Sequence, residues 1–136
     1  MSARQTTEQK RARRAMAYVN EVQKRPQDIQ NEYSSLARSA PADIQTNGLG
    51  QTLAFWRSKG WEKGQPKNNG HHLLYQHLSA WVCEQMGWDE KAMSEGLLGW
   101  LVEKSTDDYR RATAEAQAFL VWLKRFAEAE LGEEGK

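Results

Sequence analysis

The 136-residue sequence has few of the residues from which small proteins build covalent or metal-bound cores. It contains one cysteine, Cys83, and three histidines. A single cysteine excludes an intrachain disulfide framework and a cysteine-built zinc site. The mean hydropathy of −0.85 argues against a membrane-spanning protein. The N-terminus leads into a charged stretch without the apolar segment of a secretory signal, so we expect a cytoplasmic protein.

β-Branched aliphatic residues are also scarce. There are five valines and two isoleucines, against twelve leucines and sixteen alanines. Straight-chain and small side chains favour helices, whereas β-branched side chains favour strands. We therefore predict an all-α protein, a compact single-domain bundle of about six helices. It should span residues 1–136, with frayed tails over 1–5 and 132–136.

The apolar residues near the N-terminus recur at helical spacing, which predicts a first helix over residues 7–24. The face expected to pack on the core carries Ala12, Ala15, Met16, Val19 and Val22. A proline suits the first turn of a helix but not its interior. We therefore expect Pro26 to begin a second helix and Pro41 to end it.

The next segment, 41–56, has the apolar spacing of a helix but contains two unfavourable glycines. Gly48 and Gly50 each cost up to about 1 kcal/mol in a helix interior. We predict a helix with a weak or bent middle, in which the glycines let another backbone come close. Residues 58–70 are rich in glycine and asparagine and are predicted to form a loop.

Three further helices are predicted, over about 71–86, over about 94–104 and from Ser105 onward. Gly87 is the expected stop of the first of these, and Ser105 with Asp108 resembles a helix cap. The tryptophans at 56, 81 and 100 lie in apolar stripes and are expected in the core.

Charge is unevenly distributed, although the net charge is only +1. Residues 1–67 carry 12 basic and 6 acidic side chains, whereas residues 68–136 carry 7 basic and 12 acidic ones. On a helical wheel, the first helix has a basic face opposite its apolar face. A second basic cluster surrounds Trp61 in the predicted loop. Basic groups of this kind hold phosphates without reading bases, although a merely solvated face has the same pattern.

These two clusters supply the predicted RNA-binding residues. They are Lys10, Arg13, Arg14, Lys24, Arg25, Lys59, Lys63 and Lys67. Trp61 among its lysines is typical of a stacking platform for single strands, but we favour the alternative that its ring folds back onto the core. In the last helix, Val121 and Trp122 lie off the main apolar stripe, which indicates a partner interface.

Catalytic signatures are missing from the sequence. His71, His72 and His77 lack the i, i+3 or i, i+4 spacing of a helical metal pair, and we expect one core histidine and two at a helix start. There is no G-x-S-x-G or Walker A motif. Cys83 is expected to be an inert core thiol. We therefore predict a non-enzyme without catalytic residues, cofactor or metal. An enzyme that would still be compatible with the sequence is a metal-dependent nuclease that uses Asp107 or His77.

Residues 40–55, which read APADIQTNGLGQTLAF, resemble the signature of the small subunit of type III-B CRISPR effector complexes, the Cmr small subunit. The basic helical N-terminus and the Trp-rich second half are also similar. The resemblance implies a small helical protein without activity of its own. Copies of such a subunit stack head to tail into a minor filament beside the guide-holding backbone subunits and the polymerase-like large subunit.

In that family the filament borders the groove where target RNA pairs with guide RNA, and basic surface helps to hold it. The resemblance carries no catalytic residue to this chain, because the family motif is not a catalytic one. An alternative is a stand-alone helical DNA-binding regulator, since a bent segment 41–56 is similar to a helix-turn-helix.

Overall fold

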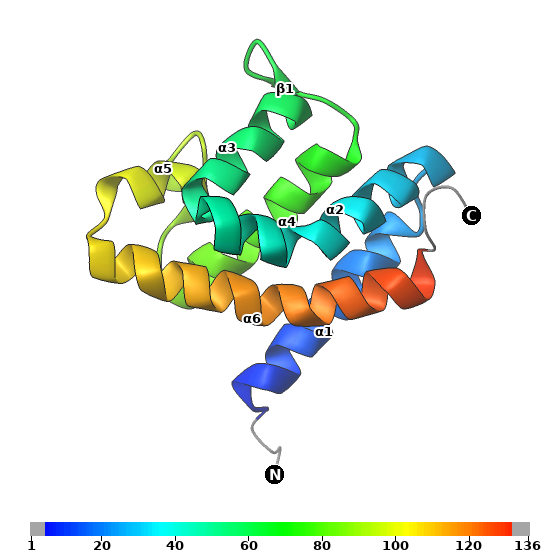
Figure 1. The fold of residues 1–136 in the computed structure, drawn as a ribbon, viewed down its shortest axis with the longest axis horizontal. Coiled ribbons are helices and arrows are strands. Elements are labelled where there is room, and N and C mark those ends of the chain that lie inside the picture. The colour runs from blue at the N-terminus through cyan, green and yellow to red at the C-terminus, as the bar shows by residue number, and fades with distance from the viewer. Residues whose placement is uncertain (1–4, 132–136) are drawn as a thin grey trace.

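The computed structural model describes residues 5–131, which form six α-helices, one 3₁₀ helix and a short hairpin (Figure 1). The elements are α1 Thr7–Val22, α2 Gln27–Asn47, α3 Leu49–Gly60, β1 Trp61–Glu62, β2 Gln65–Pro66, α4 Gly70–Met86, η1 Glu90–Ala92, α5 Leu97–Glu103 and α6 Thr106–Glu130. The predicted all-α bundle is confirmed. Apart from Gln5, the tails predicted over 1–5 and 132–136 lie outside the described residues.

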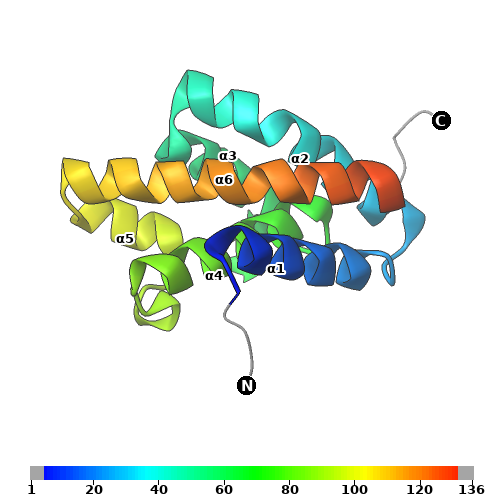
Figure 2. The ribbon, with the colours of Figure 1, turned by 90° about the horizontal axis from the view of Figure 1, so that it is seen from below.

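The long helix α6 runs along one side of the molecule and packs mainly on α1 and α2 (Figures 1 and 2). Behind it, α4 packs between α2 and α3. The largest buried side chains are Trp56, Trp81, Tyr33 and Phe119. The predicted burial of Trp56 and Trp81 is confirmed, whereas Trp100 is only half-buried.

Helix α2 continues through Pro41, so the prediction that this proline ends the helix is wrong. Pro41 lacks an N–H and cannot bond to the carbonyl of Ala37, a loss that costs about 3 kcal/mol in an unsupported helix. Here α2 is supported by α4 and α6, and Ala37 and Ala40 are fully buried. Burial of this stretch outweighs the local preference of proline.

The break comes instead at Gly48, with φ 90° and ψ 157°, so segment 41–56 forms parts of two helices rather than one bent helix. A backbone with this φ favours glycine. The expected approach of another backbone to Gly48 and Gly50 is also wrong. A side chain comes close instead, because the hydroxyl of Tyr109 lies 2.7 Å from the amide nitrogen of Gly50.

The predicted loop 58–70 contains more structure than expected. Helix α3 extends to Gly60, and β1 then pairs with β2 in antiparallel register. The two turn residues, Lys63 and Gly64, both have positive φ, at 52° and 80°. Two such residues are typical of a tight hairpin turn. The hairpin thus holds Lys63 at its tip.

The predicted helix boundaries around α4 and α6 are confirmed. Gly87 caps the end of α4 with φ 76°, in the left-handed conformation. The side chain of Ser105 accepts a hydrogen bond from the N–H of Asp108 at 3.2 Å and caps the start of α6.

Candidate nucleic-acid interface

The outer face of α1 carries two exposed cations, Lys10 and Arg13, and a third, Lys24, lies in the turn that follows the helix. A capping box between Thr6 and Gln9 fixes the start of the helix, and Val19 and Val22 anchor its opposite face in the core. None of the three cations forms an ion pair with another residue of the described range 5–131. Their charges are therefore open to an anionic ligand.

Arg14 does not lie on this outer face, and its predicted binding of RNA stays a prediction. Its guanidinium donates to Glu84 on α4 at 2.8 Å and lies 5.1 Å from the ring centre of Trp81. The reason is that the core side of α1 is rotated toward Tyr18, whose ring stacks on His77 at 3.9 Å. Met16, predicted to face the core, is 48% exposed.

Arg25 links the end of α1 to the segment after the hairpin. Its guanidinium lies 3.5 Å from the side-chain oxygen of Asn68, and a weak ion pair with Glu21 spans 3.7 Å. Next to Asn68, the amide of Lys67 donates to the carbonyl of Gly60 at 2.7 Å. These contacts bring the end of α1 and the hairpin together.

The hairpin segment is also tied to Lys59, because Asn69 donates to the carbonyl of that residue at 3.0 Å. The turn after α1, the end of α3 and the hairpin segment, which carry five of the sequence-predicted cations, are therefore in contact. We call this surface the cationic edge, and it comprises Lys24, Arg25, Lys59, Lys63 and Lys67. Four of the five side chains are exposed, and Arg25 is partly buried.

Lys10 and Arg13 lie at the other end of α1, away from the cationic edge. Twelve residues of helix separate Lys10 from Val22, the last residue of α1, which is a rise of about 18 Å at 1.5 Å per residue. The structure thus divides the predicted RNA-binding residues into the cationic edge, the remote pair Lys10 and Arg13, and Arg14 in its ion pair with Glu84.

Trp61 folds back onto the core, as favoured from the sequence. Arg57 lies 4.3 Å above its ring, and the rings of His72 and Tyr75 pack against it at 4.5 and 4.8 Å. Burial lowers the pKa of His72, so this imidazole is neutral near pH 7. Trp61 is therefore held in place by a cation and two rings.

The exposed aromatic beside the lysines is Phe55, which sequence reasoning missed. Its side chain is 55% exposed, and the ammonium of Lys59 lies 5.6 Å from its ring centre. The signal that reveals it is the four-residue spacing of Gln51, Phe55 and Lys59, which places all three on one face of α3.

The groups considered for catalysis are buried or paired. The pKa of His77 is lowered to about 3, first by burial and then by the charge of Arg25. Burial raises the pKa of Cys83 to about 12. Asp107 lies 3.3 Å from Arg110. Within residues 5–131, no group of three or more His, Cys, Asp or Glu side chains is placed to hold a metal ion.

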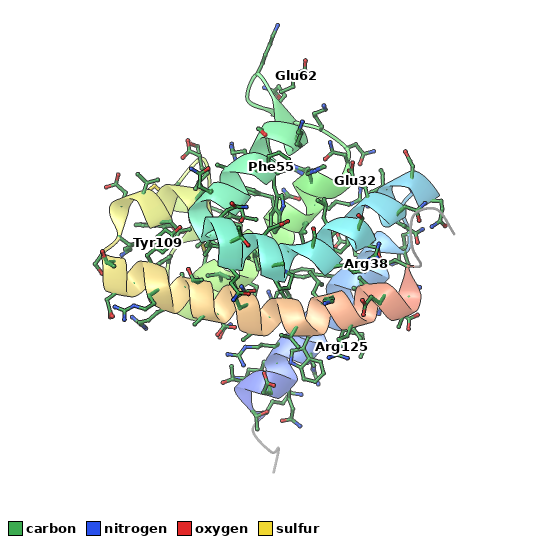
Figure 3. All side chains as sticks on the ribbon, in the orientation of Figure 1. Glu32, Arg38, Phe55, Glu62, Tyr109 and Arg125 are labelled. Atoms are coloured by element: carbon green, nitrogen blue, oxygen red, sulfur yellow. The ribbon has the colours of Figure 1, made fainter. Side chains whose placement is uncertain are left out.

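The predicted partner surface at Val121 and Trp122 lies on α6 beside the start of α1. Val121 is 53% exposed, whereas Trp122 is half-buried, stacks on Phe126 and donates to Glu8 at 3.4 Å. These side chains and Arg125 line a groove of about 390 Å³. Figure 3 shows Arg125 on the side of α6 that faces away from Phe55. The role of this groove in binding a partner stays a prediction.

Across residues 5–131, no helix has both the length and the apolar character that a bilayer crossing requires. Residues 7–130 match the family described as CRISPR-associated protein (Cas_Cmr5). The fold is also similar to the X-ray crystal structure of a CRISPR-associated Cmr5 family protein from Thermus thermophilus. That protein is 28% identical in sequence, with a TM-score of 0.72, and the match covers 93% of this chain and 98% of the other.

Proposed function

Because this chain belongs to the Cas_Cmr5 family, and so is the small subunit of a type III-B Cmr complex, we propose that it is a non-catalytic assembly subunit. In this proposal, copies of the chain stack into a minor filament beside the backbone subunits and the polymerase-like large subunit. The cationic edge helps to hold guide and target RNA in cytoplasmic antiviral defence, and the other subunits perform the chemistry.

The observation that carries the proposal is the family match over residues 7–130, which spans nearly all the structure that is described. The cationic edge supports the RNA-holding part. Lys24, Lys63 and Lys67 are exposed and form no ion pair within residues 5–131, so binding a phosphate breaks no internal contact. Lysine acts on phosphates as a point charge and reads no base, so these lysine contacts do not depend on the sequence of the RNA.

The non-catalytic part is supported by the state of the reactive side chains. The thiol of Cys83, with a pKa of about 12, is protonated at neutral pH and is a poor nucleophile. His77 is buried, and its Nδ1 atom is engaged by Tyr33 at 2.7 Å. Neither group is available to a substrate.

The proposal is tested by purifying the Cmr complex through a tag on this chain and measuring how much target RNA it retains as salt is raised. The variant Lys24→Ala/Lys63→Ala/Lys67→Ala should lose target RNA at lower salt than the wild type. A matched control removes three cations elsewhere, with Lys91→Ala/Arg110→Ala/Arg111→Ala. Equal retention by both variants at every salt concentration would contradict RNA holding by the cationic edge.

The comparisons give no support to the alternative of a stand-alone DNA-binding regulator. That alternative requires a sequence-specific footprint of the isolated chain on duplex DNA. We expect none, since the proposed contacts are made to phosphates. Failure of the tagged chain to co-purify with a guide-RNA particle would contradict the assembly role itself.

A further inference from the structure

We propose that the outer face of α3 is a stacking site for an unpaired RNA base, with Phe55 as the stacking ring. This inference rests on the proposed RNA-holding function and assigns it a second, non-electrostatic contact. Lys59 supplies a cation for the adjoining phosphate. Polar side chains of α2 and α3 face the edge of the base.

The first support is the order of side chains along α3. Gln51, Phe55 and Lys59 recur every four residues, and all three are exposed. They form a stripe about 12 Å long at 1.5 Å per residue. An amide, an aromatic ring and a cation are the three kinds of group with which proteins hold a single strand.

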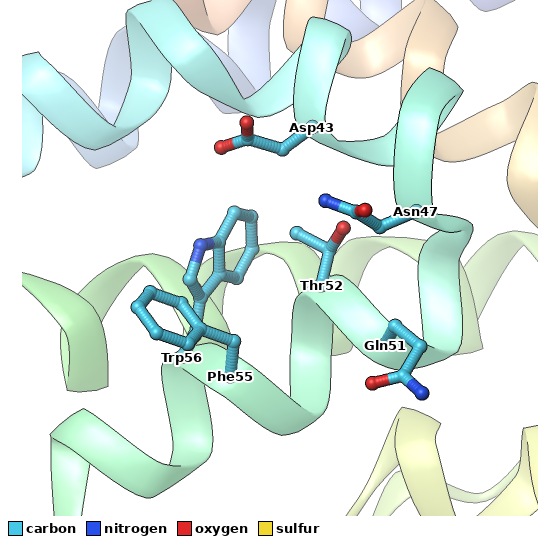
Figure 4. Close-up of a pocket in the computed structure, with 6 residues that line it drawn as sticks. All are labelled: Asp43, Asn47, Gln51, Thr52, Phe55 and Trp56. Atoms are coloured by element: carbon cyan, nitrogen blue, oxygen red, sulfur yellow. The ribbon is translucent and has the colours of Figure 1, made fainter.

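The second support is a groove between α2 and α3, shown in Figure 4. It measures about 460 Å³ and is lined by Asp43, Asn47, Gln51, Thr52, Phe55 and Trp56. Asp43 and Asn47 lie on α2, across the groove from the aromatic rings of α3. The groove thus combines an apolar wall with a polar one, as ligand sites do.

The polar groups of this groove have unused hydrogen-bonding capacity. The side chains of Asp43, Asn47 and Gln51 form no hydrogen bond or ion pair with any residue between 5 and 131. Thr52 differs, since its hydroxyl donates to the carbonyl of Gly48 at 2.9 Å. Three free polar side chains beside an exposed ring are not needed for folding and are available to a ligand.

Folding does not require the position of the Phe55 ring. The inward positions of α3 are filled by Leu49, Leu53 and Trp56, each at most 1% exposed. The ring and cation contacts of Phe55 are with the edge of His71, at 6.3 Å between ring centres, and with the ammonium of Lys59. An aromatic side chain left in water beside a cation points to a planar ligand with an attached negative charge.

A base of single-stranded RNA fits this surface better than a second copy of the chain. The exposed large hydrophobic residues of the described range lie on four different helices, and Phe55 is the one on α3. A stable protein interface needs a contiguous apolar centre, which a single ring does not supply. Lys63 and Lys67, both exposed in and after the hairpin, add further cations for a phosphate backbone.

The acidic member of the groove adds a preference among bases. The carboxylate of Asp43 accepts hydrogen bonds, and cytosine, adenine and guanine carry an exocyclic amino group that donates them. Uracil has no such group. We therefore expect the site to favour amino-bearing bases over uridine.

The experiment uses the full chain and fluorescein-labelled r(CA)5, measured by anisotropy at low salt. The variant Phe55→Ala should bind this strand about fivefold or more weakly, since stacking contributes about 1–3 kcal/mol per base. For the same strand annealed to its complement, Phe55→Ala should weaken binding by less than about twofold, because paired bases are not free to stack. Phe55→Tyr, which keeps a ring, should bind like the wild type.

Two controls separate the contributions. Val102→Ala removes another exposed apolar side chain, 75% exposed on α5, and should leave binding unchanged. Lys59→Ala should weaken single strands and duplexes alike, because it acts on phosphates. Wild-type binding to r(U)10 should be weaker than to r(CA)5, and Asp43→Ala should reduce that difference.

Each contrary result has a distinct meaning. If the wild type binds r(CA)5 and Phe55→Ala binds it equally well, the stacking site is wrong while RNA holding stands. If Phe55→Ala instead lowers self-association by sedimentation with RNA binding unchanged, the face is a contact between copies and the inference is overturned. If the wild type binds neither r(CA)5 nor r(U)10 at low salt, the RNA-holding function is wrong, and so is the stacking site.

Discussion

The amide of Gly50 on α3 donates a hydrogen bond to the hydroxyl of Tyr109 on α6, with 2.7 Å between nitrogen and oxygen. The residue before α3, Gly48, has no side chain with which to cap the helix. Tyr109 therefore satisfies one of the free N–H groups of the first turn from a distant helix. The contact fixes α3, and with it Phe55 and Lys59, relative to α6.

We predict that Tyr109→Phe lowers the free energy of unfolding by about 1–2 kcal/mol, because the amide of Gly50 loses its acceptor. Urea unfolding followed by circular dichroism measures this change. In a double-mutant cycle, Gly50→Ala should cost less in the Tyr109→Phe background than alone, since its Cβ would lie 3.0 Å from the hydroxyl. Additive costs would show that the two residues do not interact.

A second prediction concerns the buried pair Tyr33 and His77, whose hydroxyl oxygen and Nδ1 lie 2.7 Å apart. Because the carboxylate of Glu21 lies 3.6 Å from Nε2, we assign the proton of the neutral ring to Nε2 and the donor role to Tyr33. His77→Phe should destabilise the protein by about 1–3 kcal/mol, since it leaves a buried hydroxyl without a partner. Tyr33→Phe/His77→Phe should recover part of that loss in urea unfolding.

The same histidine predicts a pH dependence of stability. Burial lowers its pKa in the folded protein to about 3 from an ordinary value of 6.5. Below pH 6.5, His77 binds a proton in the unfolded chain but stays neutral in the folded chain, so stability is lost as the pH falls toward 3. Between pH 7 and 5, the wild type should lose about 1–2 kcal/mol more than Tyr33→Phe/His77→Phe. Parallel pH profiles would contradict this assignment.

Neighbouring arginines of α1 should behave differently. Arg14→Ala removes a 2.8 Å ion pair with Glu84 and a contact with Trp81, so we expect a loss of about 1 kcal/mol in unfolding free energy. Arg13→Ala, on the exposed face, should change stability by less than about 0.5 kcal/mol. Equal effects in thermal or urea unfolding would mean that the contacts of Arg14 contribute nothing.

Cys83 should be inert in the folded protein. Its side chain is buried and the pKa of its thiol is raised to about 12, so almost no thiolate is present at pH 8. We expect a colorimetric disulfide reagent to label it only when urea unfolds the chain. Rapid labelling in native buffer would show that α4 opens readily.

The sequence was sufficient to predict the fold class because periodic apolar spacing dominates helices α1, α4 and α6. It failed at Pro41, where local preference favours a break but packing of Ala37 and Ala40 keeps the helix intact. It also misplaced the Arg14 side chain on the outer face of α1, since a wheel centred on apolar residues alone ignores Tyr18, which turns the core side of α1 toward α4.

The candidate site was only partly predictable for a related reason. The lysines at 59, 63 and 67 follow from composition, but their proximity to Arg25 depends on a contact with Asn68, 43 residues away. Likewise, spacing alone does not decide whether Trp61 or Phe55 is exposed. That depends on Arg57, His72 and Tyr75, which enclose the tryptophan in the folded chain.

The most direct test of RNA holding is the salt dependence of single-stranded RNA binding by the wild type and by Lys24→Ala/Lys63→Ala/Lys67→Ala. Each phosphate contact contributes about −0.7 to the slope of log K against log salt concentration for single strands. If the three lysines of the cationic edge bind phosphates, the variant's slope should be shallower by about 2. Identical slopes and affinities for the two proteins would contradict the account.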